Sequence, residues 1–348
     1  MGARKHILIL HTGGTLAMET KRGRGPLRPG DFERTLRARV PEIWQLANIR
    51  FQVFSNIDSS DMRPELWSSL AERVFESLGG NGSSAKYDGV VLTHGTDTMS
   101  WTASALSFML RGLRKPVVIT GSQRPLGELR TDARVNLIDA VTAAVEGPGE
   151  VTVCFDSKLY RGNRTRKTKT NDFDAFESPN YPVLGTLGVE VVFSEGRAAE
   201  GRFRVMPDLE PRVFLLKIFP GMPPTIARAI LPGLAGLVVE GFGAGNFPVA
   251  GDSSLLPLFD EAHDRGIPVV MVTQARCNSV DLTLYEAGAQ AAKRGVIGGG
   301  DMTPEAAVTK LMHVLAYERD PERVRRQLER NLVGERTEAP RASRAGAA

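Results

Sequence analysis

The chain has 348 residues, of which 42% are hydrophobic and 24% are charged, and its formal net charge is +4. This composition is typical of a globular protein with a large core, and at roughly 100–200 residues per domain the length predicts about two domains. The charge excess is small and no basic stripe is interleaved with aromatic residues, so we expect no nucleic-acid partner. No apolar run is long enough for a membrane helix, which argues against a membrane-spanning protein.

The amino terminus, MGARKHILILHTGG, has a short basic start followed by a short apolar run. A secretory signal needs a longer apolar region and a small-residue cleavage site, so we expect a cytoplasmic protein. Two cysteines, Cys154 and Cys277, are too few for a disulfide framework. The five histidines are scattered along the chain without the spacing of a metal site.

The first predicted strand, residues 4–11, ends in a loop with two glycines followed by Thr15. Glycines at a strand end let the backbone approach a ligand closely. A phosphate-binding loop is the alternative, but neither of its glycine patterns is present. Residues 19–30 are rich in glycine and arginine and fit either a mobile lid over a site or a plain surface loop. A short helix is expected over residues 31–39.

A second loop of this kind follows the strand predicted over residues 49–54. It contains Asp58, Ser59 and Ser60, and Pro64 suits the first turn of the next helix. The loop again lies between a strand and a helix. In an open α/β sheet, ligands bind at the carboxyl ends of the strands.

The third loop follows a buried parallel strand predicted over residues 89–92. It carries Thr96 and Asp97 and leads into a helix over residues 99–113. One interpretation is that Asp97 or Thr98 merely caps this helix. The other is that a hydroxyl and a carboxylate lie in a ligand site at the sheet edge, beside the positive end of the helix.

The rest of the first domain continues the alternation of strands and helices. We expect a strand over residues 116–119, a helix over 131–145 and a strand over 151–155. Residues 158–169 hold six basic residues and no acid, so they either face solvent or turn one cation toward an acidic partner. Residues 183–193 are predicted as a pair of strands.

Residues 194–212 are polar and interrupted by glycine and proline, which is typical of a linker. Beyond them a smaller βαβ pattern begins. The predicted organisation is therefore a larger amino-terminal domain over residues 1–193, a linker over 194–212, a smaller α/β domain over 213–334 and a disordered tail over 335–348. In the smaller domain, strands are expected over 213–219, 236–240 and 267–273, and helices near 253–265, 283–294, 303–317 and 321–332.

The hydroxyl-bearing loops limit the possible covalent chemistry. The sequence contains no Ser-His-Asp order and no G-x-S-x-G elbow, and neither cysteine has a catalytic histidine nearby. A threonine would therefore carry any covalent step. Because a threonine hydroxyl is a weak nucleophile, it needs a base, for which a neutral lysine relayed through Asp97 is one candidate.

These loops resemble the signatures of the bacterial type I, cytoplasmic L-asparaginases. The first signature is TGGTLA at residues 12–17, and the second is LTHGTDTM at residues 92–99. Between them, DSSDM at residues 58–62 resembles the substrate loop of that family. Further similar stretches, in the family's order, lie at residues 119–123, 159–165, 242–246, 295–298 and 301–303.

The resemblance implies a large doubly wound, mostly parallel catalytic α/β domain followed by a smaller α/β domain. It implies hydrolysis of the L-asparagine side-chain amide to L-aspartate and ammonia, without metal or organic cofactor. By position, Thr15 is the nucleophile that forms an acyl-enzyme, and Thr96, Asp97 and Lys167 form a second constellation that activates a hydroxyl or water. Lys167 is chosen over Lys169 because it lies five residues after the glycine of the family pattern. Which threonine is acylated stays open.

The resemblance also implies a substrate-binding set. Asp58, Ser59 and Ser60 hold the α-amino and α-carboxylate groups, Asp97 suits the α-amino cation, and the backbone N–H of Thr96 is a candidate oxyanion donor. Members of the family are homodimers or homotetramers, so a homo-oligomer is expected.

Two features depart from the family pattern. The segment over residues 18–30 has no tyrosine, although family members commonly carry one in the lid. Glu240 stands where asparagine-regulated members carry a basic residue, so allosteric control is not assumed.

Several alternatives remain at the level of sequence. They are a glutaminase or mixed asparaginase-glutaminase of the same family, the glutamine-using subunit of a transfer-RNA amidotransferase, and a non-catalytic amino-acid sensor on the same fold. The amidotransferase subunit normally carries an additional amino-terminal domain, for which no room is expected before residue 12.

Overall fold

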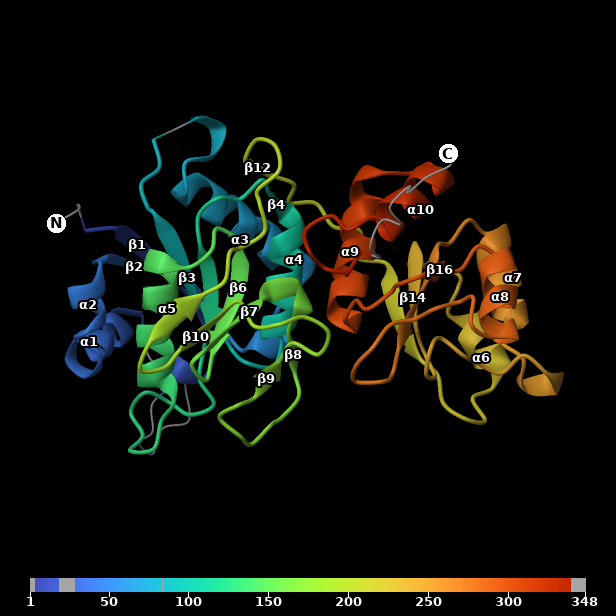
Figure 1. The fold of residues 1–348 in the computed structure, drawn as a ribbon, viewed down its shortest axis with the longest axis horizontal. Helices are drawn as coiled ribbons and strands as arrows, with labels where there is room; N and C mark the ends of the chain where they lie inside the picture. Colours follow the sequence, from blue (N-terminus) through green and yellow to red (C-terminus); the bar gives the residue numbers. More distant parts are fainter. Residues whose placement is uncertain (1–3, 19–28, 83, 339–348) are drawn as a thin grey trace, which may run out of the picture. The chain divides into compact units, whose positions relative to one another are not determined.

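The computed structural model describes residues 4–18, 29–82 and 84–338. The chain divides into two compact units, Met1–Pro211 and Arg212–Ala348. Figure 1 shows that each unit has its own sheet and its own helices, so each is described by itself. None of the helices in the described ranges has the length and apolarity needed to cross a membrane.

The larger unit is built on an eight-stranded sheet with the order β11-β10-β7-β6-β5-β3-β1-β2. The five strands from β6 to β2 run parallel, and the remaining neighbours are antiparallel. This arrangement confirms the mostly parallel α/β sheet. The strands are β1 (His6–Gly13), β2 (Asn48–Ile57), β3 (Gly89–Thr93), β5 (Val117–Thr120), β6 (Val151–Phe155), β7 (Lys158–Arg161), β10 (Gly185–Leu187) and β11 (Val191–Phe193).

Helices cover both faces of this sheet, as the alternating side chains of β1 require. Ile7 and Ile9 lie in one buried cluster, which also contains residues of α1 (Pro29–Arg39), α2 (Ile43–Leu46) and α5 (Ala133–Glu146). Leu8 and Leu10 lie in the opposite cluster, which includes residues of α3 (Pro64–Ser77) and α4 (Met99–Met109). The doubly wound arrangement therefore follows from two apolar faces on the same strands (Figure 1).

Two expectations about this unit are wrong in detail. The helix predicted to reach residue 113 ends at Met109, and the chain continues as β4 (Leu110–Arg111). β4 pairs with β12 (Arg204–Val205), which lies inside the segment predicted as a linker. Part of that segment is thus bound to the larger unit. A further two-stranded sheet joins β8 (Arg166–Lys167) to β9 (Phe176–Glu177).

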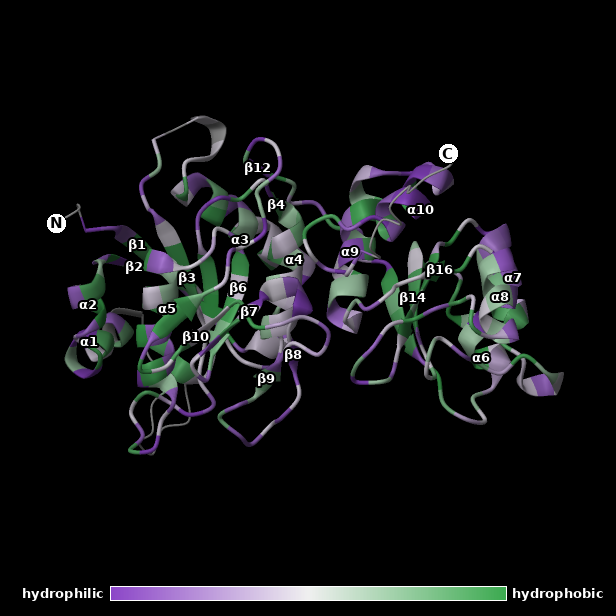
Figure 2. Ribbon diagram, in the orientation of Figure 1, coloured by the Kyte–Doolittle hydropathy of each residue, from purple (hydrophilic) through white to green (hydrophobic). Residues whose placement is uncertain are grey.

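The smaller unit contains a parallel four-stranded sheet with the order β13-β14-β15-β16. Figure 2 shows hydrophobic residues along β6 of the larger unit, whereas the last helix of the smaller unit, α10 (Pro321–Glu329), is largely hydrophilic. The strands are β13 (Val213–Lys217), β14 (Gly236–Gly241), β15 (Val269–Thr273) and β16 (Ile297–Gly298). The helices are α6 (Pro224–Ala229), α7 (Leu256–Asp264), α8 (Glu286–Lys293), α9 (Pro304–Tyr317) and α10 (Pro321–Glu329).

The tail predicted over residues 335–348 begins too early. Glu335 is fully buried, and one of its carboxylate oxygens lies 2.6 Å from Nζ of Lys310, which is also fully buried. Its carboxylate accepts hydrogen bonds from the backbone N–H groups of Leu332 and Val333. A buried ion pair with these additional hydrogen bonds belongs to the core of the unit. Residues 339–348 lie outside the described residues.

Candidate active site

Three strand-end loops of the larger unit meet through glycine contacts. A β-carbon on Gly14 would lie 2.5 Å from Cα of Gly95, and one on Gly95 would lie 2.5 Å from Oγ of Ser59. Gly14 also has a positive φ of 88°, which other residues rarely adopt. The glycines therefore bring the loops of Thr15, Ser59 and Thr96 into close contact, at the carboxyl ends of β1, β2 and β3.

Hydroxyl groups tie the same loops together. Thr12 donates from Oγ1 to the carbonyl of Thr93 at 3.0 Å, and Ser55 donates to the carbonyl of Thr12 at 2.9 Å. Thr98 occupies the N-cap position of α4, but its side chain does not cap the helix. Its hydroxyl donates instead to the carbonyl of Ser59 at 2.7 Å. The expected cap is thus replaced by a contact between two loops.

Thr96, Asp97 and Lys167 form one hydrogen-bonded group. Lys167 Nζ lies 2.7 Å from Thr96 Oγ1 and 2.7 Å from Asp97 Oδ1. Thr96 is 7% exposed and the lysine side chain 15%, whereas the Asp97 side chain is 67% exposed. The short strand β8 carries Lys167 to this position by pairing with β9. Lys169 forms an exposed ion pair with Asp174 instead.

Thr15 begins a short 3₁₀ turn, η1 (Thr15–Ala17), directly after the two glycines of the β1 loop. Its side chain is half-buried. The backbone N–H of Met18 donates to the Thr15 carbonyl at 3.0 Å. Residues 19–28, which include most of the predicted lid, lie outside the described residues.

The predicted substrate loop forms the 3₁₀ turn η2 (Ser59–Asp61), with Asp58 as its N-cap. The carboxylate of Asp58 accepts a hydrogen bond from the backbone N–H of Ser60 at 2.8 Å. Hydrogen bonds from Ser60 hold the pKa of Asp58 below its usual value. Asp58 and Ser60 are exposed and Ser59 is buried. An ionised carboxylate at this edge is suited to bind an ammonium group.

The structure adds Gln123, which the sequence interpretation did not assign to the site. Thr96 Oγ1 lies 3.2 Å from Gln123 Oε1. The side-chain nitrogen of Gln123 lies 3.3 Å from the Thr170 carbonyl and 3.0 Å from the Asp172 carbonyl. The sequence contained a signal for assigning Gln123 to the site. Residue 123 follows β5, the parallel neighbour of β3, and it ends one of the stretches that resemble the family.

Two buried histidines, His11 and His94, form hydrogen bonds close to these loops. His94 lies 2.7 Å from the Gly95 carbonyl through Nδ1 and 2.9 Å from Oγ1 of Thr102 through Nε2. His11 lies 2.8 Å from Oγ1 of Thr93. Burial lowers the pKa of each histidine to about 4, so both are neutral near pH 7. Within the described ranges, no three His, Cys, Asp or Glu side chains gather as a metal site.

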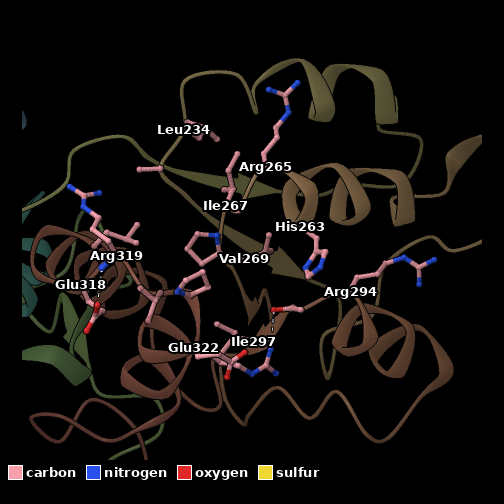
Figure 3. A pocket seen from close by; sticks show the side chains of 18 of the residues that line it. Leu234, His263, Arg265, Ile267, Val269, Arg294, Ile297, Glu318, Arg319 and Glu322 are labelled. Atoms are coloured by element: carbon pink, nitrogen blue, oxygen red, sulfur yellow. Dashed lines mark hydrogen bonds between the residues drawn. The ribbon is translucent and has the colours of Figure 1, made fainter.

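A separate cavity of about 450 Å³ lies at the amino ends of the strands in the smaller unit (Figure 3). Figure 3 shows the guanidinium groups of Arg265 and Arg294 extending away from Val269 and Ile297. Those two arginines form ion pairs with Glu261 and Asp260. None of the predicted site residues lines this cavity.

Comparison with known proteins identifies the family. Residues 6–198 match the family described as "Asparaginase, N-terminal", and residues 212–328 match "Glutaminase/Asparaginase C-terminal domain". The chain belongs to the asparaginase family. The resemblance inferred from the two threonine-bearing signatures is therefore confirmed.

Individual members of the asparaginase family are similar over nearly the whole chain. L-asparaginase 1 of Escherichia coli (strain K12) is 40% identical over 343 residues, which cover 96% of this chain and 98% of that protein. The solved thermostable L-asparaginase from Thermococcus kodakarensis has a TM-score of 0.88 and 39% identity, over 96% of this chain and 100% of that one. A glutamyl-tRNA(Gln) amidotransferase subunit of Pyrococcus furiosus is 36% identical over 349 residues, 95% of this chain and 76% of that protein.

Proposed function

We propose that this protein is an L-asparaginase that converts L-asparagine and water to L-aspartate and ammonia. The observation that carries the proposal is the position of Lys167 Nζ, 2.7 Å from both Thr96 Oγ1 and Asp97 Oδ1, beside a loop that contacts the loop of Thr15. A basic amine in contact with a threonine hydroxyl is the arrangement that nucleophilic catalysis by threonine needs.

In the proposed first step, the Thr15 hydroxyl oxygen attacks the carboxamide carbon of the substrate. The hydroxyl proton passes to the leaving nitrogen, the C–N bond breaks, and ammonia leaves an ester on Thr15. In the second step a water molecule attacks the ester carbon. Its proton returns to the Thr15 oxygen as the C–O bond breaks, and aspartate leaves. Atoms balance over the two steps without an added reagent.

Thr96 and Lys167 are proposed to move the proton in these steps. Lys167 acts as the base when it is neutral and returns the proton as an ammonium group. Asp97 stabilises that ammonium through the contact at 2.7 Å. Because the Asp97 side chain is 67% exposed, water screens this attraction, and its exposed oxygen is available to the α-amino group of the substrate.

The proposed substrate pocket uses the loop of residues 58–60 for the α-amino and α-carboxylate groups. Asp58 is kept ionised by its hydrogen bonds from Ser60 and suits the ammonium. One methylene is worth only about 1–3 kcal/mol of discrimination, so a glutaminase or mixed activity is the nearest alternative. A sensor that binds asparagine without cleaving it is the alternative from another class.

Ammonia release from L-asparagine and L-glutamine, compared in wild type and Thr15→Ala, tests the proposal. The wild type should release ammonia faster from asparagine, and the variant should lose this activity. Thr142→Ala is the matched control, since Thr142 lies on α5 and donates to the Ile138 carbonyl of its own helix. Binding of asparagine without ammonia release would favour the sensor, and a higher kcat/KM on glutamine would favour the glutaminase.

We also propose a cytoplasmic location and a homodimer or homotetramer, on the strength of the family resemblance. Light scattering at micromolar concentration measures the assembly directly, and a monomeric mass would contradict the oligomer.

A further inference from the structure

The side-chain amide of Gln123 has a defined orientation. Its nitrogen faces the carbonyl oxygens of Thr170 and Asp172, at 3.3 and 3.0 Å, and both of these groups can only accept hydrogen bonds. The amide NH₂ must therefore point toward them. Its oxygen, Oε1, then faces Thr96 Oγ1 at 3.2 Å and can only accept.

This orientation decides where the Thr96 proton lies. A threonine hydroxyl has one proton, and Thr96 donates it in the hydrogen bond to Gln123 Oε1. The contact between Thr96 Oγ1 and Lys167 Nζ, at 2.7 Å, then requires the lysine to be the donor. In the resting site Lys167 thus donates to both Thr96 and Asp97.

The backbone of Gln123 is held as firmly as its side chain. The carboxylate of Asp132 accepts from the backbone N–H of Gln123 at 2.9 Å and from that of Arg124 at 3.1 Å. Asn136 donates to the same carboxylate at 3.0 Å. Asp132 is only 9% exposed, so these hydrogen bonds are shielded from water. Gln123 is therefore fixed at both ends.

We propose that Gln123 is a positioning residue for the amide hydrolysis, because its side-chain oxygen accepts the hydrogen bond of the Thr96 hydroxyl and thereby turns the Thr96 proton away from Lys167. This inference rests on the proposed function. Before Lys167 can take the Thr96 proton, Lys167 must be neutral and the hydroxyl must rotate away from Gln123. While the Thr96 hydroxyl donates to Gln123, it cannot also donate to Lys167.

Charged groups lie on several of the elements that surround Lys167. Helix α4, which packs against β8, carries no charged residue. Asp97 is the ion-pair partner of Lys167, whereas Lys169 pairs with Asp172 and Asp174. The remaining charged groups on the elements beside Lys167 are Arg164 in the turn before β8, Arg166 on β8 and Glu177 on β9.

Two near-isosteric variants give opposite expectations. Gln123→Glu keeps an acceptor toward Thr96 and adds a negative charge, which favours the ammonium. Gln123→Met removes the acceptor and frees the Thr96 hydroxyl to donate to a neutral amine. Gln123 also lines a cavity of about 320 Å³ with Arg124, Arg130 and residues 170–173, so side chains of similar size have room.

The test combines kinetics with direct titration of the lysine. In ¹⁵N-lysine-labelled protein, the Lys167 side-chain signal is assigned by its loss in Lys167→Arg, and its midpoint is followed with pH in the intact enzyme. The midpoint should rise by roughly 0.5–1 pH unit in Gln123→Glu and fall by a similar amount in Gln123→Met, the size expected for one hydrogen bond. The limb of the pH profile of kcat that reports this titration should shift in the same direction as the Lys167 midpoint.

In Gln123→Met, kcat should also fall about 10- to 100-fold with little change in KM, as expected when a reacting group loses its orientation. Gln45→Met, at an exposed position of α2, is the matched control and should change neither quantity. Loss of activity with no movement of the Lys167 midpoint, or movement in the same direction in both variants, would overturn the inference. If the wild type cleaves neither amide while the two midpoints still diverge, the proposed function fails and the placement of the Thr96 proton by Gln123 stands.

Discussion

Gly14 and Gly95 are in backbone contact, since a β-carbon on Gly14 would lie 2.5 Å from both Cα and N of Gly95. This contact joins the loop that carries Thr15 to the loop that carries Thr96. A backbone atom cannot rotate aside as a side chain can, so the space is closed to any larger residue. The close contact between the two threonine-bearing loops therefore requires glycine at residue 14.

We expect Gly14→Ala to displace the Thr15 loop and to lower kcat by about 100-fold, since a misplacement of 1 Å can cost that much. The added methyl group meets the Gly95 backbone, and φ of 88° adds strain, so the free energy of unfolding should also fall by about 1–3 kcal/mol. Steady-state kinetics and chemical denaturation measure the two effects.

Gly233→Ala is the matched control, because Gly233 has nearly the same φ of 92° but no atom within 4 Å of the added β-carbon. It should share the strain and keep full activity. If both variants lose stability equally and Gly14→Ala keeps its kcat, the contact with Gly95 does not position the site.

The predictions from sequence that succeeded depend on local patterns. Apolar runs bounded by glycines gave the parallel strands, and parallel strands present their carboxyl ends at one edge, where the loops that follow β1 and β3 are in contact. The structural features that the sequence did not predict involve contacts with residues far along the chain. Thr98 looks like a helix cap, but its hydroxyl bonds to Ser59. The amide of Gln123 is oriented by carbonyl groups 47 and 49 residues away, which no local pattern reveals.

The same reasoning explains the errors at the domain boundaries. β4 and β12 have two residues each, too few for a recognisable alternation, and their pairing joins segments more than 90 residues apart. Glu335 lies in a polar segment whose composition is typical of a solvated tail, and its ion pair with the fully buried Lys310 is a contact that this composition does not reveal.

Lys167 and Lys169 allow a direct test of the catalytic constellation. Lys167→Met should lower kcat by roughly 10²–10⁴-fold, the usual contribution of a general acid–base group. Lys169→Met removes a charge two residues away that pairs with exposed carboxylates, so kcat should stay within about twofold. Equal losses in the two variants would indicate a general electrostatic effect of this hairpin instead of a base at residue 167.

The buried pair of Lys310 and Glu335 should be a large contributor to the stability of the smaller unit. Burial raises the pKa of Glu335, but the Lys310 charge and the hydrogen bonds outweigh burial and lower it overall. Lys310→Met leaves an uncompensated buried charge and should reduce the free energy of unfolding by about 3–5 kcal/mol. Arg37→Met, which breaks an exposed pair with Glu33, should cost less than about 1 kcal/mol. Denaturant unfolding of both variants decides whether burial makes this difference.

The pH dependence of stability should reflect the two buried histidines beneath the site loops. Burial lowers the pKa of His11 and His94 from 6.5 to about 4 in the folded protein. The unfolded chain therefore binds more protons between pH 4 and 6.5, so the free energy of unfolding rises with pH across that window. Each histidine contributes at most about 3 kcal/mol, fully present above pH 6.5 and lost as the pH falls to 4.

Asp139 should oppose this trend. Burial raises its pKa to about 6, so the folded state binds the extra proton between pH 4 and 6, and its contribution to stability falls as the pH rises through that range. Asp139→Asn keeps an acceptor for the Ser157 hydroxyl, which lies 2.9 Å from Oδ2, but removes the titration. The variant should show a steeper gain in unfolding free energy between pH 4 and 6 than the wild type, measured by urea denaturation at a series of pH values. His94→Gln should flatten the same curve, and unchanged slopes in both variants would show that these buried groups do not control the acid stability of the protein.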